Sequence, residues 1–185
     1  MDLAYQAVAA LADLHQMGND DNDSDNRALV THGDVDITQF VSSDGGKHYK
    51  INDFNGALWI YYNDETDGVC PFYPAMGGCK TRSPEEYSGY MVTEKVDIYS
   101  IGNVIYSILV GKYPFHDLSS DRVKELVKSG HTPDIPESYQ RSDDPNIQAL
   151  LQAMQLCWVK EPSRRISARH LEEYLRPFAT KNKAP

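Results

Sequence analysis

The stretch VDIYSIGNVIYSILVG, residues 96–111, is the feature that most constrains how this chain can fold. It is apolar around its whole circumference apart from Asp97 and Asn103, and it is too short to span a bilayer. A helix that is apolar on every side is stable in water only when other elements cover it. We therefore expect a buried central helix over residues 93–110, with the rest of the chain packed around it.

The remaining periodic segments are also mostly helical. Leu3, Ala7, Leu11 and Leu14 recur at helical spacing and predict a first helix that ends near Gly18. Two short β-prone runs, FVS and HYKI, flank the turn sequence SDGG and predict one hairpin. Further helices are expected over residues 119–129, 145–159 and 167–175, with Ser119 and Ser167 as N-caps. The fold class that follows is mainly α with a small β-hairpin.

Composition narrows the function classes. A chain of 185 residues with 41% hydrophobic content is large enough for one domain with a continuous core. A net charge of -9 argues against binding to a nucleic-acid backbone, which requires clustered cations. The three cysteines form no CxxC pair, and the N-terminal helix lacks the basic start of a signal peptide. We expect a protein of the cytoplasm or nucleus, with no membrane and no nucleic-acid partner.

Two segments predict loops. The acidic stretch at about residues 19–27 invites a calcium-binding interpretation, but an EF-hand counted from Asp21 would place Asn26 at its glycine and His32 at its glutamate. A solvated loop insert is the better interpretation. Residues 57–82 show no sustained period, so we expect a long surface loop there, of a length that is usually functional or disordered.

The candidate chemistry lies on either side of the expected hairpin. The stretch HGDVDITQ holds Asp34 just before the first strand, and KINDFN holds Asp53 just after the second. Because a hairpin returns the chain to its starting end, we expect these two carboxylates to converge on one open edge. A lone aspartate is usually a helix or turn cap, so the convergence is what favours a site.

Taken in order, HGDVDITQFV, KINDFNGA, SPEEY, VDIYSIG, GKYPF and LCWVKEPSRRIS resemble the landmarks of the protein kinase large lobe. The resemblance runs from about Leu3 to Leu175, and the LCW turn is most similar to tyrosine-kinase and tyrosine-kinase-like members. It implies a large lobe over residues 1–178, with an activation segment at about residues 53–85 and a flexible tail at residues 179–185.

The resemblance also implies roles for site residues. Asp34 matches the aspartate that accepts or orients the substrate hydroxyl proton, and Asp53 of DFN matches the magnesium-binding aspartate. Gln39 stands in the position of the asparagine that binds the second magnesium, and Val41 would form the floor beneath adenine. Phe54 is expected to pack next to His32. The implied cofactors are ATP and Mg²⁺.

Departures from the family pattern predict weak catalysis. Asp36 stands where many kinases carry a lysine that neutralises the transferred phosphoryl group, and losing one such contact costs roughly 3 kcal/mol, or about a hundredfold in rate. Gly33 replaces an arginine that grips a phosphorylated activation loop, and the longer Gln39 would hold the second magnesium more weakly. Asn55, where the family has glycine, is a mild departure because asparagine tolerates left-handed geometry.

The scaffold positions match better. Glu85 and Arg165 match a buried family ion pair, and Asp97 matches an aspartate that accepts hydrogen bonds from catalytic-loop amides. Trp158 and Phe115 are expected to be core packing.

The sequence contains no Gly-rich phosphate loop and no strand lysine of the VAIK type, so we expect the small lobe to be absent and this portion alone to be inactive. ATP and Mg²⁺ binding would then be weak or absent. Three interpretations stay open: a protein kinase that is active in its full-length parent, a pseudokinase that acts as a binding or allosteric scaffold, and a truncated gene model with an in-frame upstream small lobe. The expected partner is a protein substrate or docking partner, with self-association through the uncovered cleft.

Overall fold

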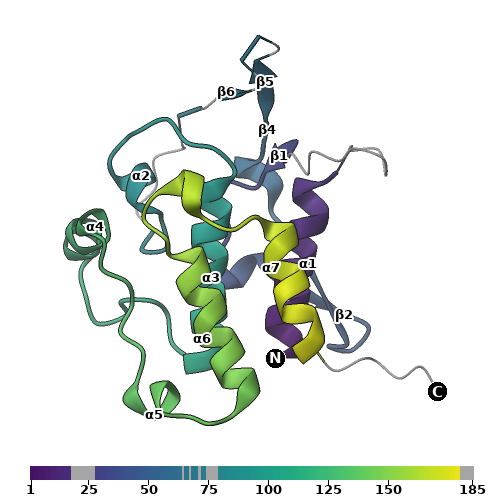
Figure 1. Cartoon of the computed structure of the whole chain (residues 1–185), viewed down its shortest axis with the longest axis vertical. Coiled ribbons are helices and arrows are strands. Elements are labelled where there is room, and N and C mark those ends of the chain that lie inside the picture. Colours follow the sequence, from purple (N-terminus) through teal and green to yellow (C-terminus); the bar gives the residue numbers. More distant parts are fainter. Residues whose placement is uncertain (18–27, 64, 67, 71, 74–78, 180–185) are drawn as a thin grey trace.

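The computed structural model describes residues 1–17, 28–63, 65–66, 68–70, 72–73 and 79–179. The expected loop insert at residues 19–27, most of the tail and parts of the activation segment lie outside the described residues. The described part is mainly helical, as expected, with a few short strands (Figure 1). Its α-helices are α1 (Asp2–His15), α2 (Pro84–Tyr87), α3 (Lys95–Val110), α4 (Ser120–Ser129), α5 (Glu137–Gln140), α6 (Pro145–Cys157) and α7 (Ala168–Leu175).

The apolar stretch forms the central helix α3, which confirms the first prediction. Ile98, Ile101 and Ile105 are fully buried, and α3 packs against both α6 and α1. Gly102 permits the close approach of α6, because a Cβ atom there would lie 2.7 Å from Cβ of Cys157. The helix ends at Gly111, whose φ of 72° is the left-handed geometry that terminates many helices.

The outer helices follow their sequence signals. Helix α1 packs along α7 (Figure 1), and Tyr5 of α1 donates a hydrogen bond of 2.7 Å to Glu172 of α7. Ser119 and Ser167 cap α4 and α7 by accepting hydrogen bonds from first-turn amides, as predicted. Helix α6 ends at Cys157, two residues before the predicted end, and Trp158 follows it as a buried core residue.

The strands in the described part of the chain form three antiparallel pairs, rather than the single predicted hairpin. The predicted hairpin is present, and β2 pairs with β3 in a register that places Val41 opposite Lys50. The prediction of a long irregular loop over residues 57–82 was wrong, because two further pairs, β1–β4 and β5–β6, use residues from this range. Strands of two or three residues are too short to show a period in the sequence. The strands are β1 (Val30–Thr31), β2 (Phe40–Ser43), β3 (His48–Ile51), β4 (Leu58–Trp59), β5 (Tyr61–Asn63) and β6 (Gly68–Cys70).

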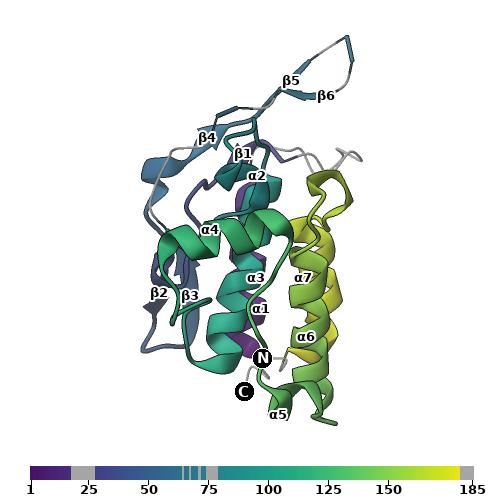
Figure 2. The ribbon, with the colours of Figure 1, turned by 90° about the vertical axis from the view of Figure 1, so that its left-hand side faces the viewer.

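The strands sit at the periphery of the helical body. Figure 2 shows the β2–β3 hairpin on the edge away from α6 and α7, α4 crossing the front, and β5–β6 projecting at one end. Short 3₁₀ turns connect these elements at Ile37–Gln39, Phe54–Gly56, Pro162–Arg164 and Arg176–Phe178. Within the described residues, no helix combines the length and apolarity needed to cross a membrane.

Candidate active site

The loop that carries Asp34 is anchored by the buried Asp97 of α3. Oδ2 of Asp97 accepts hydrogen bonds from the His32 amide at 2.7 Å and from the Thr31 hydroxyl at 2.8 Å. Oδ1 accepts from the Gly33 amide at 2.9 Å, and Nε2 of His15 lies 3.0 Å from Oδ2. The prediction that Asp97 holds the loop amides is therefore confirmed, and it explains an acid inside an apolar helix.

The electrostatics of Asp97 favour its charged form. Burial alone would raise the pKa of this carboxyl, but the hydrogen bonds from His15, His32 and Thr31 outweigh burial. The pKa of Asp97 therefore lies below its ordinary value. An ionised carboxylate at this point holds the start of the loop through several charge-assisted hydrogen bonds at once.

His32 links the loop to the segment that carries Asp53. Its Nδ1 accepts a hydrogen bond from the Asp34 amide at 3.3 Å, and its Nε2 lies 2.9 Å from the carbonyl oxygen of Asn52. Because Nδ1 accepts, Nε2 carries the proton and donates it, which is the neutral tautomer. The ring of Phe54 lies 5.3 Å from the His32 ring, which confirms the predicted contact.

Gly33 has a structural reason to be glycine. Its φ is 73°, and a Cβ atom at this position would lie 2.5 Å from the carbonyl oxygen of Gly56. A larger residue would push the Phe54–Gly56 turn away from the loop. Sequence reasoning treated Gly33 only as a lost arginine, and it missed this close approach.

The hairpin brings Gln39 and Asp53 to the same end. The Asn52 amide donates to the Gln39 carbonyl at 2.8 Å, directly below the Phe40–Ile51 pair, and Asp53 follows one residue later. Asp34 lies close by, since a Cβ atom built on Gly56 would be 3.6 Å from the Asp34 Cβ. Val41 lies further along β2, where its side chain is exposed. Gln39 and Asp53 therefore lie at the open end of the hairpin with Asp34 near the adjoining Gly56, and Val41 lies one pair further into the hairpin.

Asp53 adopts an uncommon backbone conformation, with φ 62° and ψ 67°. Left-handed geometry at a residue other than glycine is costly and gathers at functional sites, although aspartate tolerates it better than most. Its exposed carboxylate accepts a hydrogen bond of 2.7 Å from the Asn55 side chain through Oδ1. The Asn55 substitution therefore places an amide against the candidate metal ligand.

Asp34 and Asp36 have different surroundings. Oδ1 of Asp34 forms an ion pair of 2.9 Å with Arg82. Asp36 caps the Ile37–Gln39 turn by accepting from the amide and hydroxyl of Thr38, each at 3.0 Å. The acid in the lysine position is therefore used in local structure, while the candidate base faces a cation from elsewhere in the chain.

The candidate ligands are too few for a metal site built from protein side chains alone. They suit a magnesium ion that is bound together with phosphates. Among the described residues, no group of three or more His, Cys, Asp or Glu side chains could hold a metal ion. Magnesium usually binds through one or two carboxylates and completes its shell with water and substrate phosphates. Asp53 and Gln39 each carry a side-chain oxygen of this kind, and their backbones lie at the same end of the hairpin.

A buried ion pair between Glu85 and Arg165 fixes the end of the activation segment. Arg165 donates to both oxygens of Glu85, at 2.7 and 3.2 Å, and also to the Val159 carbonyl at 3.0 Å. Both side chains are buried, and the guanidinium lies 5.2 Å from the centre of the Tyr99 ring. The predicted pair is confirmed in the bidentate geometry that suits arginine.

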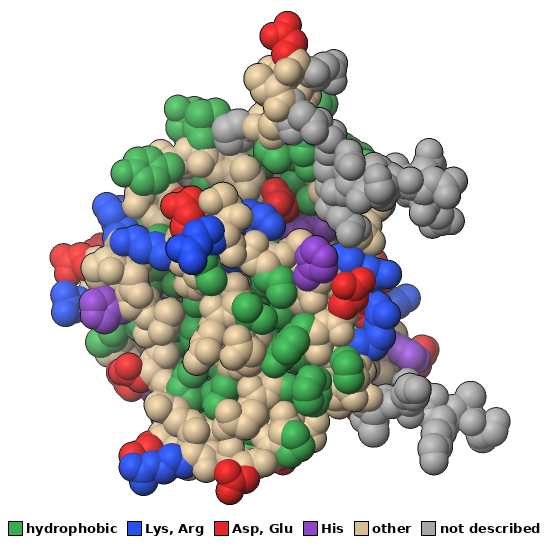
Figure 3. Space-filling model, viewed as in Figure 1, with side chains coloured by type: hydrophobic (Ala, Val, Ile, Leu, Met, Phe, Trp, Pro, Cys, Tyr) green, Lys and Arg blue, Asp and Glu red, His purple; other side chains and the backbone are tan. Residues whose placement is uncertain are grey.

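The segment that follows Asp53 carries exposed apolar side chains, which we call the apolar rim together with Val41. Phe54, Leu58, Trp59 and Tyr61 are large side chains that remain exposed, and Val41 shares this exposure. On the face drawn in Figure 3, separate apolar side chains stand at the upper edge, above a band of acidic and basic groups. Exposed apolar side chains in one segment are typical of a surface that another protein or domain covers.

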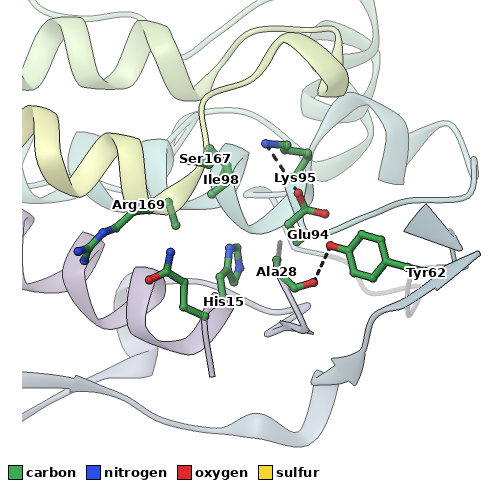
Figure 4. Close-up of a pocket in the computed structure, with 10 residues that line it drawn as sticks. His15, Ala28, Tyr62, Glu94, Lys95, Ile98, Ser167 and Arg169 are labelled. Atoms are coloured by element: carbon green, nitrogen blue, oxygen red, sulfur yellow. Dashed lines mark hydrogen bonds and ion pairs between the residues drawn. The ribbon is translucent and has the colours of Figure 1, made fainter. Parts of the chain in front are cut away.

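Two cavities lie away from the candidate residues. One of about 200 Å³ is lined by His15, Glu94, Lys95 and Arg169, among others, where α1, α3 and α7 meet (Figure 4). The other, of about 450 Å³, lies between the α4–α5 connection and α6 and is lined by Thr132 and Gln152, among others. Neither is lined by Asp34, Gln39, Val41 or Asp53.

Sequence reasoning also missed two partners of the site, His15 and Arg82. His15 lies at the end of α1, where burial of a histidine among apolar residues was a weak signal. Arg82 precedes the SPEE motif, and no spacing rule connects it with Asp34. Both become visible only once the helices and the loop are placed together.

Comparison with known proteins places the chain in a family. Residues 1–175 match the family model described as protein kinase domain. The chain is 30% identical to dual specificity protein kinase pyk3 of Dictyostelium discoideum over 139 residues, which is 75% of this chain and 9% of that protein. It is 25% identical to Tribbles homolog 2 of Mus musculus over 176 residues, or 93% of this chain and 44% of that protein.

A third relative is receptor-interacting serine/threonine-protein kinase 2 of Bos taurus, with 28% identity over 76% of this chain and 28% of that protein. The chain thus spans less than half the length of each of these relatives. The family match covers the Asp97 network, both segments of the candidate site and the Glu85–Arg165 pair. On this match, the chain belongs to the protein kinase domain family.

Proposed function

We propose that this chain supplies the base and the metal-binding part of an ATP-dependent protein kinase site, which phosphorylates protein hydroxyls in the full-length parent. In this proposal Asp34 is the base, Asp53 and Gln39 are the magnesium ligands, and Val41 lies beneath adenine. ATP supplies the phosphoryl group and Mg²⁺ neutralises its charge. The partner is a protein substrate, and residues 1–175 serve as the large lobe of the domain.

The observation that carries this proposal is the Asp97 network. The buried Asp97 carboxylate accepts hydrogen bonds from Thr31, His32 and Gly33. The backbone that leads to Asp34 is therefore held in place by the core. A preorganised base is the main requirement of a reaction in which the protein contributes position and charge. A phosphate site explains why the Asp97 network holds this loop next to Asp53, whose backbone is in the costly left-handed conformation.

Finer assignments are also part of the proposal. The LCW turn favours the tyrosine-kinase-like branch, and we propose a protein of the cytoplasm or nucleus. We propose slow transfer rather than fast transfer, because Asp36 adds negative charge where the reaction builds more. This chain alone is proposed to be inactive.

A pseudokinase scaffold is the second candidate, and a specific observation favours it. Both key carboxylates already have side-chain partners, Asn55 on Asp53 and Arg82 on Asp34. Together with Asp36, Gly33 and Gln39, this pairing fits a fold that is kept as a docking platform after its catalytic charges have changed. The exposed apolar rim would then be part of the binding surface.

Calorimetric titration with Mg-ATP tests the metal assignment. In the full-length parent, which carries the small lobe, we expect weak binding that Asp53→Ala abolishes, while Asp44→Ala, at the tip of the hairpin, leaves it unchanged. Equal affinity in wild type and Asp53→Ala would remove Asp53 from the site.

Radiolabelled phosphate transfer separates the kinase from the scaffold. We expect Asp36→Lys in the full-length parent to raise transfer by about a hundredfold if a missing cation limits the rate. Asp36→Asn is the matched control, since it removes the charge and keeps an oxygen that can cap the Ile37–Gln39 turn. No transfer by any of these proteins, with Mg-ATP binding intact, would favour the scaffold.

A further inference from the structure

Arg82 lies directly before α2 and joins that helix to the candidate catalytic loop. Its Nη2 donates to Oδ1 of Asp34 at 2.9 Å. Its Nη1 donates to the Gly33 carbonyl at 2.6 Å and to Oε1 of Glu86 at 3.0 Å. The guanidinium is therefore held at both terminal nitrogens, and only 12% of the side chain is exposed.

Glu86 is itself fixed by the first turn of α2. Its Oε2 accepts hydrogen bonds of 2.7 Å from both the amide and the hydroxyl of Ser83. This is a capping box, and it forms only when the first turn of the helix is folded. The position of Arg82 therefore depends on the end of the activation segment, far from Asp34 in the sequence.

Arg82 keeps its positive charge in these surroundings. Burial alone would lower the pKa of its guanidinium, but the carboxylates of Glu86 and Asp34 outweigh burial and raise it. An arginine in such a pair presents fixed donors in one plane, which orients a carboxylate more strictly than a lysine does.

The ion pair still leaves Asp34 available. Its side chain is 45% exposed, and none of the described residues donates a hydrogen bond to its Oδ2. One oxygen is thus held by Arg82, while the side chain stays partly open to solvent. A carboxylate that is paired at one oxygen keeps one orientation and can still accept a proton at the other oxygen.

The local charge balance gives Arg82 a second effect. Asp34 and Asp36 lie two residues apart, and the loop between His32 and Gln39 contains no lysine or arginine. The guanidinium of Arg82 is the cation that the fold places against this acidic loop.

We propose that Arg82 is a positioning residue for Asp34: it holds the carboxylate in one rotamer and partly balances the negative charge of the loop. Because Glu86 and Ser83 hold Arg82, this support exists only while the first turn of α2 is folded. The catalytic consequence rests on the proposed kinase function, but the positioning of Asp34 does not.

The positioning can be measured by NMR in the whole chain. Three-bond couplings about χ1 report whether Asp34 keeps one rotamer, and Asp36 serves as an internal reference because Thr38 holds it. We expect one rotamer in the wild type, rotamer averaging at Asp34 alone in Arg82→Met, and partial recovery in Arg82→Lys. Arg122→Met, which removes an exposed pair with Glu125, is the matched control and should leave Asp34 unchanged.

Folding is checked first, because loss of Arg82 leaves Glu86 buried without its cation. Each variant is compared below its own unfolding transition. If Arg82→Met does not fold, Glu86→Gln with Arg82→Lys replaces it, and the expected result is again averaging at Asp34 alone. Unchanged Asp34 couplings in folded variants, or equal changes in Arg122→Met, would overturn the proposal.

A transfer assay on the full-length parent separates this inference from the proposed function. We expect Arg82→Met to lower kcat by about a hundredfold with little change in KM, as a misplaced base does. A wild type that transfers phosphate as slowly as Asp34→Asn, with Asp34 couplings that respond to Arg82, would contradict the kinase proposal and leave the positioning intact. Active wild type and equally active Arg82→Met would contradict the positioning.

Discussion

The two segments that form the candidate site are held in opposite ways. The loop from Thr31 to Asp34 rests on the core, and its Thr31 and His32 side chains are fully buried. The segment from Asp53 to Tyr61 lies at the surface, where Trp59 is 60% exposed and Tyr61 is 70% exposed. The comparison teaches that the support for the proposed base lies within this chain, whereas the segment that carries the proposed metal ligand Asp53 is largely exposed.

We expect the largest effect on the free energy of unfolding from the buried Glu85–Arg165 ion pair. Removing one partner of a buried ion pair leaves an uncompensated charge, so Arg165→Ala should destabilise the chain by about 3–5 kcal/mol. Urea unfolding followed by circular dichroism measures this difference. The control is Arg122→Ala, which breaks an exposed pair and should cost less than about 1 kcal/mol. Equal effects of the two substitutions would show that the Glu85–Arg165 pair is not part of the support.

The Asp97 network predicts an effect that depends on pH. Asp97→Asn should cost about 2–3 kcal/mol at pH 7, because several hydrogen bonds lose their charged acceptor. Since the pKa of Asp97 is lowered on folding, its contribution is complete above the unfolded value of about 3.9 and is lost as the pH falls through the folded value.

Unfolding curves at several pH values measure this loss. The difference between wild type and Asp97→Asn should be constant near neutral pH and should shrink below about pH 4. A difference that stays constant down to pH 2 would mean that the ionised carboxylate is not what holds the loop.

A substitution in the exposed apolar rim should have the smallest effect on stability and a measurable effect on self-association. Trp59→Ser should change the free energy of unfolding by no more than about 0.5 kcal/mol, because a largely exposed side chain loses little contact. If the apolar rim drives the self-association that we expect, the same substitution should lower it in sedimentation velocity runs. Tyr90→Ser, at another exposed aromatic residue outside the rim, is the control. Equal association of all three proteins would show that the rim is not the contact surface.

The difference between the two segments also determined what the sequence could predict. The central helix, the β2–β3 hairpin and the Ser119 and Ser167 caps follow local rules of period, turn and capping, and they were predicted. The Asp97 and Glu85–Arg165 contacts were inferred from the family resemblance and are present as expected.

The missed features depend on tertiary structure. Strand β4 is only two residues long and forms because Leu58 and Trp59 meet β1 across the chain. Gly33 needs its left-handed φ because Gly56 lies against it. The Arg82–Asp34 pair joins residues far apart in sequence, and its geometry exists only when α2 and the loop are both in place. None of these contacts leaves a pattern in a single sequence.

The most direct test asks whether the two segments meet at one metal. Mn²⁺ can replace Mg²⁺ with ADP, and its unpaired electrons broaden the NMR signals of nearby residues. We expect Asp53, Gln39 and Asp34 to broaden first, and Asp53→Ala to remove the effect. Broadening that centres on the acidic residues of α4 or α7 instead, or that persists unchanged in Asp53→Ala, would contradict a shared phosphate site at this end of the hairpin.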